Sequence, residues 1–313
     1  MRAGIRKDEW LELAAEADGQ DLNVWLREAS GLPDKLIRKL EAEKGVRIKG
    51  DRLFLRLFPR EEPQFAAEWN VPPILYEDDF CLVADKPAGM AVHPSRPEEN
   101  GTLANAIAGY YIMTGQECRV RHIHRLDEDT SGPVLYAKNE LAQLRLDEEM
   151  RKKTIGRTYL AVVHGRLGTA RGTIDAPIGK DRHQAGRRRV SATGDPAVTH
   201  YETVEDFPGF TLVRLRLETG RTHQIRVHMS HIGHPLAGDE LYGGKRQLAL
   251  FSSMPESGSK AGRPAVTYTF NRQALHGERL SFPHPMTGEW IQAECPLPED
   301  FHELLQHLRK MYR

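Results

Sequence analysis

The polar loop at residues 121–132, RHIHRLDEDTSG, concentrates side chains that could do chemistry. It follows neither a helical nor a strand period, and its Thr-Ser-Gly end is typical of a fixed turn. Folds often place reactive groups on loops that a rigid scaffold holds. Asp127, which follows His124 and Arg125, is therefore a candidate nucleophile or base. On local chemistry alone, a solvated charged turn is the simpler interpretation.

A second polar segment, residues 217–231, reads LETGRTHQIRVHMSH. Gly220 marks a turn into an expected helix at 222–233, which places Arg221 at the helix start, where the helix dipole disfavours a cation. A carboxylate partner such as Asp127 would compensate, and an arginine neighbour would keep that carboxylate ionised. We therefore expect an Arg221–Asp127 pair, with an ordinary surface arginine as the alternative.

Histidines in this segment raise the possibility of a metal site. His228, His231 and His234 are three residues apart, with His223 nearby, but no H-E-x-x-H motif or acidic ligand accompanies them. We therefore expect no metal, and a histidine-metal hydrolase stays a minor hypothesis. The sequence also contains no G-x-x-x-x-G-K-[ST] or G-x-S-x-G motif, which argues against a P-loop nucleotide site and an ordinary serine hydrolase.

The chain carries 44 Lys and Arg against 44 Asp and Glu, but residues 119–231 hold 20 basic against 14 acidic residues. Such a basic segment can present a positive face to a polyanion. The loop 180–190, KDRHQAGRRRV, contains Arg188 and has no apolar face. A phosphate-contact surface could combine this loop with Arg151, Lys152, Lys153 and Arg157. A merely solubilising loop is the alternative.

The elements that must position these groups begin near residue 74. Strands and helices alternate there without a regular βαβ repeat, which predicts an α+β fold with a mixed, largely antiparallel central sheet and flanking helices. We expect helices at 102–111, 140–153 and 222–233 and strands at 80–86, 133–139, 157–165 and 210–217. Residues 245–264 lose periodicity and are expected to form a mobile surface insertion.

Residues 1–70 predict a separate small α/β module, followed by a domain at 71–313. Helices are expected at 21–29 and 33–44, and a hairpin around residues 49–51. This order loosely resembles the RNA-binding module of small-subunit ribosomal protein S-four, although any small helical packing domain could carry it. The proline-containing stretch 60–73 is expected to be a linker.

Composition excludes several classes of protein. The sequence has no run of about 18 apolar residues that could span a membrane, and no apolar run follows its charged start, so no secretory signal is expected. Cys81, Cys118 and Cys295 lie far apart, which disfavours a disulfide framework and fits a reducing cytoplasm. The sequence shows no heptad repeat, and we expect a monomer.

Five segments, taken in order, resemble motifs of the RluA/RluD-type family of RNA pseudouridine synthases. The resemblance runs from about Leu75 to Pro296, and a later segment, LHGERLSFPHPMTG, is similar to the family's closing strand. Five ordered motifs are specific enough to override the solvated-turn interpretation. The segments are KPAGMAVHP (86–94), HRLDEDTSG (124–132), RTY (157–159) with the strand after it, ETGRTHQIRVH (218–228) and GHPLAGDELYG (233–243).

The resemblance implies isomerisation of uridine to pseudouridine in structured RNA, ribosomal rather than transfer RNA, without a metal or organic cofactor. It implies that Asp127 is the catalytic aspartate, that Tyr159 stacks on the target base and assists proton transfer, and that Arg221 pairs with Asp127. Arg125 would lie near the extruded base, with Ile225 and Leu236 as walls of the uracil pocket. The remaining expected substrate or RNA contacts are His124, Thr130, Lys153, Arg157 and Arg188.

The reaction suits these residue types. The N-glycosidic bond must break and C5 must bond to the sugar, with no atom gained or lost overall. An ionised carboxylate could act covalently on the ribose or the ring, or as a base at the sugar. Flipping a stacked uridine costs a few kcal/mol, which phosphate contacts can offset. A non-catalytic RNA-binding or ribosome-assembly factor of the same fold is the alternative, although it would be expected to have lost Asp127, Tyr159 or Arg221.

Overall fold

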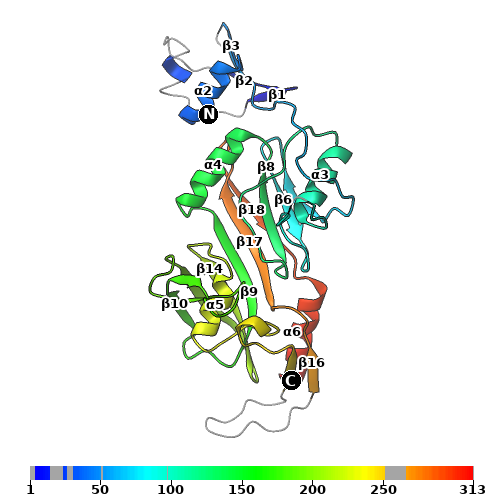
Figure 1. The fold of residues 1–313 in the computed structure, drawn as a ribbon, viewed down its shortest axis with the longest axis vertical. Helices are drawn as coiled ribbons and strands as arrows, with labels where there is room; N and C mark the ends of the chain where they lie inside the picture. The colour runs from blue at the N-terminus through cyan, green and yellow to red at the C-terminus, as the bar shows by residue number, and fades with distance from the viewer. Residues whose placement is uncertain are drawn as a thin grey trace.

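The computed structural model describes residues 4–14, 24–26, 31–50, 52–96, 98–250 and 266–312. The molecule is elongated, with the N-terminal module at one end and helix α6 (Glu299–Tyr312) at the other (Figure 1). Two antiparallel sheets lie between these ends. The predicted α+β fold with a largely antiparallel central sheet and flanking helices is confirmed.

A six-stranded sheet runs from the lower part of the molecule in Figure 1 up along its middle, beside the second sheet. Strand β14 shows how its faces differ, because Val213 and Leu215 are buried while Arg216 on the opposite face is exposed. Helix α6 packs on the face that carries Leu160 and Leu212. In spatial order the strands are β10 (Arg171–Asp175), β13 (Val198–Phe207), β14 (Phe210–Leu217), β9 (Gly156–His164), β17 (Leu275–Pro283) and β18 (Trp290–Glu294).

A four-stranded sheet forms the upper half of this core. Its two central strands are almost wholly buried, under helices α3 (Leu103–Met113) and α4 (Glu140–Arg151). Thr102 caps α3 by accepting the Asn105 amide, as its hydroxyl at the predicted N-cap position allows. In spatial order the strands are β5 (Ile74–Glu77), β6 (Cys81–Lys86), β8 (Gly132–Ala137) and β7 (Arg121–His122).

The two sheets meet where β17 passes the start of β8. The Gly277 amide donates to the Ser131 carbonyl at 2.8 Å, and Ser131 and His276 form a parallel bridge. A Cβ atom on Gly132 would lie 2.7 Å from the Gly277 Cα, and the φ of Gly132 is +133°. This glycine–glycine crossing brings the sheets together beside the polar loop 121–132.

The N-terminal module contains a four-stranded sheet and helix α2 (Asp34–Ala42), which confirms the second expected helix and the hairpin. The sheet has the order β1 (Ile5–Lys7), β2 (Trp10–Ala14), β4 (Arg52–Leu55) and β3 (Val46–Lys49), of which β1 and β2 were not expected. Most of the helix predicted at 21–29 lies outside the described residues. The rings of Phe58 and Phe80 pack edge-on at 5.5 Å and join the module to the four-stranded sheet.

Smaller elements cover the six-stranded sheet. The expected surface insertion at 245–264 is partly wrong, because residues 247–250 form a strand that pairs with residues 266–269; residues 251–265 lie outside the described part of the chain. None of the described helices is both long and apolar enough to cross a bilayer. These elements are β11 (Ile178–Lys180), β12 (Arg188–Val190), α5 (Gln224–His231), the 3₁₀ turn η1 (Glu240–Tyr242), β15 (Gln247–Leu250) and β16 (Val266–Thr269).

Candidate active site

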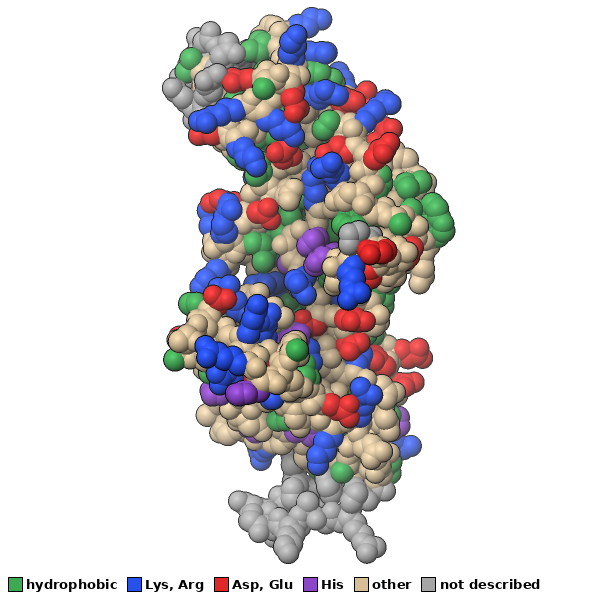
Figure 2. Space-filling model, viewed as in Figure 1, with side chains coloured by type: hydrophobic (Ala, Val, Ile, Leu, Met, Phe, Trp, Pro, Cys, Tyr) green, Lys and Arg blue, Asp and Glu red, His purple; other side chains and the backbone are tan. Residues whose placement is uncertain are grey.

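A pocket of about 270 Å³ opens between the loop 121–132 and the start of α5. We call it the central pocket. It contains Asp127 and lies beside the region of α5 and β10, where Lys and Arg side chains gather in Figure 2. Its walls come from the loop 121–132, from three strands of the six-stranded sheet, from α4 and from the start of α5. The other residues that line it include His124, Arg125, Thr130, Arg157, Tyr159, Leu217, Arg221, His223, Ile225, Arg226 and Leu275.

A buried lysine, Lys86, holds the loop that carries Asp127 in place. Lys86 is fully buried, and its ammonium donates to the carbonyls of Pro87, Met90 and Glu128 at 2.8, 2.6 and 2.8 Å. Burial lowers the pKa of Lys86 to about 7, against the attraction of Asp127. The KPAG motif therefore fixes the backbone of the residue after Asp127.

The following residues of this loop are fastened from the C-terminal third of the chain. Arg272 donates to the Asp129 carbonyl at 3.1 Å, and Gln273 donates to the Thr130 hydroxyl at 3.3 Å. Ser131 hydrogen-bonds to the His276 ring at 2.9 Å. The loop is thus rigid and largely buried at its end, which fits a catalytic loop better than a solvated turn.

The partner of Asp127 is Arg226, so the predicted Arg221–Asp127 pair is wrong. The Arg226 Nη1 lies 3.3 Å from the Asp127 Oδ2. Arg226 also makes a two-pronged pair with Asp239, at 2.7 and 2.9 Å. Arg221 instead turns outward and donates its Nε to the Pro196 carbonyl at 3.0 Å, although it still lines the central pocket.

The helix dipole concerns only residues at the end of a helix, so it pointed to Arg221 at the turn and not to Arg226. Arg226 lies inside α5, where its side chain is 10% exposed, and a buried arginine needs carboxylate partners. Asp239, in the later GDELYG motif, is one such partner. This acidic residue was the signal in the sequence that could have identified Arg226. Gln224 fixes the intervening turn by accepting the Arg221 amide at 3.0 Å.

Tyr159 and Ile225 lie where the uracil pocket was expected. Both are buried and line the central pocket. Burial raises the pKa of Tyr159, so its hydroxyl keeps its proton. The prediction for Leu236 is wrong: its backbone forms an isolated antiparallel bridge with Val163 of β9, and its side chain is fully buried and does not line the pocket. Leu275 supplies the apolar wall instead.

His124, Arg125 and Thr130 all line the central pocket. His124 accepts the Leu135 amide through Nε2 at 3.3 Å, and burial lowers its pKa to about 3, so it stays neutral. Arg125 is exposed at the pocket mouth. Thr130 is buried, and its amide donates to the Asp127 carbonyl at 3.0 Å, which closes the turn.

Three of the basic residues expected on a phosphate-contact surface, Arg157, Lys153 and Arg188, occupy different environments. Arg157 is 8% exposed, lines the central pocket and donates to the Thr219 carbonyl at 3.2 Å, so it belongs to the pocket wall and not to an open surface. Lys153 is exposed and pairs with Glu218 at 3.5 Å. Arg188, on β12, is half-buried, and its backbone amide donates to the Tyr242 hydroxyl at 2.9 Å.

Two of the histidines considered as metal ligands, His228 and His234, are hydrogen-bonded within the protein. His228 is fully buried, with one ring nitrogen 2.8 Å from the Thr199 hydroxyl and the other 2.9 Å from the Ala176 carbonyl. His234 Nδ1 lies 2.9 Å from the His164 carbonyl. Both ring nitrogens of His228 are therefore occupied, and the expected residues do not converge on a metal.

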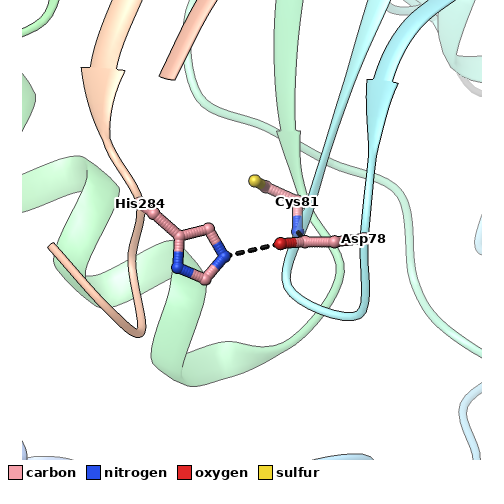
Figure 3. A group of neighbouring side chains, drawn as sticks. All are labelled: Asp78, Cys81 and His284. Carbon is pink, nitrogen blue, oxygen red and sulfur yellow. Dashed lines mark hydrogen bonds and ion pairs between the residues drawn. The ribbon is translucent and has the colours of Figure 1, made fainter. Parts of the chain in front are cut away.

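A different group within the described residues has ligand atoms within 4.8 Å of one another, namely Asp78, Cys81 and His284 (Figure 3). His284 Nδ1 accepts the Thr287 amide at 3.0 Å, so Nε2 carries the proton that it donates to Asp78 at 2.6 Å. Burial raises the pKa of the Cys81 thiol. The pKa of Asp78 falls to about 2 because hydrogen bonds, first that from His284, outweigh burial. This group ties two turns together by hydrogen bonds.

Comparison with known proteins places this geometry in a family. Residues 80–231 match the family model described as RNA pseudouridylate synthase. The chain is 46% identical over 258 residues to "Uncharacterized RNA pseudouridine synthase YhcT" of Bacillus subtilis, covering 82% of this chain and 78% of that protein. It is 39% identical over 311 residues to "Ribosomal large subunit pseudouridine synthase D" of Haemophilus influenzae, covering 99% and 93%.

Solved structures agree on the fold. Human RNA Pseudouridylate Synthase Domain Containing 4 aligns with a TM-score of 0.57 at 23% identity, over 75% of this chain and 92% of that one. The Domain Containing 1 protein gives 0.54 at 24% identity, over 77% and 95%. At these identities the likeness concerns the fold, whereas the sequence relatives carry the activity. The chain belongs to the RluA/RluD-type family of RNA pseudouridine synthases and is an isomerase.

Proposed function

We propose that this isomerase converts one or more uridines of large-subunit ribosomal RNA to pseudouridine, with Asp127 as the catalytic aspartate. The observation that carries the proposal is the placement of the Asp127 carboxylate in the central pocket, 3.3 Å from the buried Arg226. The Haemophilus influenzae relative is named for the large ribosomal subunit, which supports this choice of RNA.

The other pocket residues have roles that follow from their surroundings. Tyr159 presents a buried aromatic ring on which a flipped uracil can stack, and Ile225 offers an apolar wall. A volume of about 270 Å³ suits a single base, since small-molecule sites begin near ~300 Å³. Base flipping is required because a uridine in a helix cannot reach a carboxylate at this depth. No step of this scheme needs a cofactor.

RNA outside the pocket would be held by the basic residues around it. Arg125 at the pocket mouth and Arg188 on the β11–β12 hairpin are the proposed contacts near the flipped base. Lys153 lies beyond the pocket lining, and Arg157 contributes to its wall. Phosphate contacts of this kind offset the cost of unstacking.

We also propose that residues 1–70 act as an S-four-like RNA-binding module and residues 71–313 as the catalytic domain. Arg47 and Lys49 on β3, with Arg52 on β4, give the module a basic sheet edge that could follow an RNA backbone. A monomer in a reducing cytoplasm is part of this proposal. The buried Cys81 and Cys295 and the half-buried Cys118, all free thiols, are its support.

Tritium release from RNA labelled at uracil C5 tests the proposed function, because the isomerisation expels that hydrogen. Wild-type protein, Asp127→Asn and the matched control Asp129→Asn, which changes an exposed neighbouring carboxylate, would each be given large-subunit ribosomal and transfer RNA transcripts. We expect release from ribosomal RNA by wild type and the control only. Turnover by Asp127→Asn at the native rate would remove Asp127 from its role, and release from transfer RNA alone would contradict the proposed substrate.

A further inference from the structure

His223 has an unusual backbone conformation beside Asp127. Its φ is +58°, in the left-handed region that few non-glycine residues adopt, and it immediately precedes α5. Such conformations persist where the surroundings fix them, and they cluster at functional sites. The side chain is 18% exposed, and its Nε2 lies 4.0 Å from the Asp127 Oδ2. The strained backbone thus brings an imidazole nitrogen toward the catalytic carboxylate.

Tyr242 holds the other side of the imidazole ring. The Tyr242 hydroxyl lies 2.8 Å from His223 Nδ1, and the two rings are nearly perpendicular with centroids 5.7 Å apart. Tyr242 is 3% exposed. Its hydroxyl already accepts the Arg188 amide, which leaves its single proton to be donated to His223 Nδ1.

This arrangement selects one tautomer of His223. When Nδ1 accepts the Tyr242 proton, a neutral imidazole carries its own proton on Nε2, which faces the carboxylate of Asp127. The opposite tautomer would direct a lone pair at that carboxylate. A distance of 4.0 Å is longer than a hydrogen bond, but catalytic hydrogen bonds often tighten only in the substrate complex.

The charges around His223 come from four elements. They are Asp127 on the polar loop, Arg226 on α5, Asp239 before η1 and Arg188 on β12. Burial is the largest influence and lowers the pKa of His223, so the ring stays neutral at pH 7.

Given the role of Asp127 proposed above, we propose that His223, held by Tyr242, is a positioning residue for the reaction: its Nε2–H orients one oxygen of the Asp127 carboxylate in the central pocket, which both residues line. The Arg188 amide connects this pair to the β11–β12 hairpin. The orientation of the Asp127 carboxylate therefore depends on the position of the β11–β12 hairpin.

Replacing Tyr242 by Phe removes only the hydroxyl. We expect kcat to fall about three- to tenfold, the effect of one net hydrogen bond, with KM for RNA unchanged. The acid limb of the pH–kcat profile should move to higher pH, because His223 Nδ1 loses the donor that favours its neutral form. Tyr201→Phe is the matched control, since it removes a hydroxyl that bonds to Thr169 at 3.0 Å away from the central pocket.

His223→Asn keeps a residue that tolerates the left-handed backbone but shortens the side chain. We expect a loss of kcat at least as large, loss of the acid limb that His223 contributes to the pH–kcat profile, and no further loss or shift when Tyr242→Phe is added. Circular dichroism and thermal unfolding would confirm that each variant folds. Additive losses in the double variant, or an unchanged profile for Tyr242→Phe, would overturn the inference. Asp127→Asn in the same assay separates the two ideas, because native turnover by that variant would defeat the proposed function itself.

Discussion

At the scale of single residues, the arginine beside Asp127 decides how the carboxylate is held. Arg226 forms a planar, two-pronged pair with Asp239 and reaches Asp127 with its remaining nitrogen. A lysine has the same charge but one point-like donor group, so it cannot satisfy both carboxylates.

Arg226→Lys should therefore lower the rate of tritium release at least about tenfold, because a preorganised donor to the reacting carboxylate is lost. Arg221→Lys is the matched control, and its single-turnover rate should stay within a few-fold of wild type. An equal loss in both variants would contradict the assignment of Arg226 as the partner of Asp127.

Lys86 is a second residue whose effect can be measured, this time on stability. Lys86→Met removes three hydrogen bonds from buried carbonyls and should cost at least about 2 kcal/mol in the free energy of unfolding. The pKa of Lys86 is about 7 in the folded protein and near ~10.4 when unfolded, so the unfolded chain binds the extra proton between these values.

The stability that Lys86 contributes should consequently rise with pH from about 7 upward. Urea unfolding of wild type and Lys86→Met at pH 7 and pH 9 would measure this. The gap between the two proteins should be wider at pH 9. A narrower gap there would contradict the lowered pKa, because it would mean that folding favours the charged form of Lys86.

The sequence places Asp127, Tyr159 and Ile225 at one pocket, as the structure does, because each lies inside a contiguous motif. The sequence does not show whether Arg221 or Arg226 is the partner of Asp127, because this depends on the direction in which each guanidinium points once the helix has begun. Asp239, which attracts Arg226, comes from another segment. Leu236 fails for a related reason: its place in a motif does not reveal that its side chain points into the core beside Val163.

At the scale of elements, a helix with a clear N-cap and an apolar sequence was predicted correctly, as α3 with Thr102 shows. Strands β1 and β2 were missed because they are short. β2 joins the sheet by pairing with β4, some 40 residues along the chain, as Leu13 opposite Leu53 illustrates, and β1 pairs only with β2. Strand β15 was missed because its partner β16 follows a long segment rich in Ser, Gly and Pro, which masks the hairpin.

The joint between the two sheets gives an element-scale prediction. In Gly277→Ala the new Cβ would lie 2.9 Å from the Pro133 ring, so the crossing must open. We expect a loss of about 1–3 kcal/mol in the free energy of unfolding, together with lower turnover because the catalytic loop ends at this crossing. Gly168→Ala, whose Cβ would meet nothing within 4 Å, is the control for urea unfolding and should be close to neutral.

At the scale of the whole molecule, one hydrophobic cluster runs from the N-terminal module into the four-stranded sheet, and it includes Leu53, Phe58 and Phe80. Exposed ion pairs such as Lys39–Glu140, at 2.5 Å, add little to this contact. Packing around Phe58 is therefore the main connection between the module and the rest of the chain.

Phe58→Ala should cost about 3–5 kcal/mol of stability, since it removes a buried ring from this contact. Calorimetry should show the single unfolding transition of wild type separating into two, with the module melting first. One transition at an unchanged temperature would mean that the module is held by other contacts. The sequence alone could not show which domain the segment around Phe58 packs against. Leu57, on the same segment, is also apolar and buried, and an apolar residue type does not reveal which domain its side chain faces.

The fastening of the catalytic loop also has a consequence for protein synthesis. Ser131 bonds to His276, 145 residues further along the chain, and Arg272 and Gln273 hold the two residues before it. A growing chain makes its N-terminal parts first, so the aspartate leaves the ribosome long before the residues that fasten its loop. A nascent chain that ends before residue 272 lacks these anchors, and the ability to modify RNA should appear only when translation of the enzyme is nearly complete.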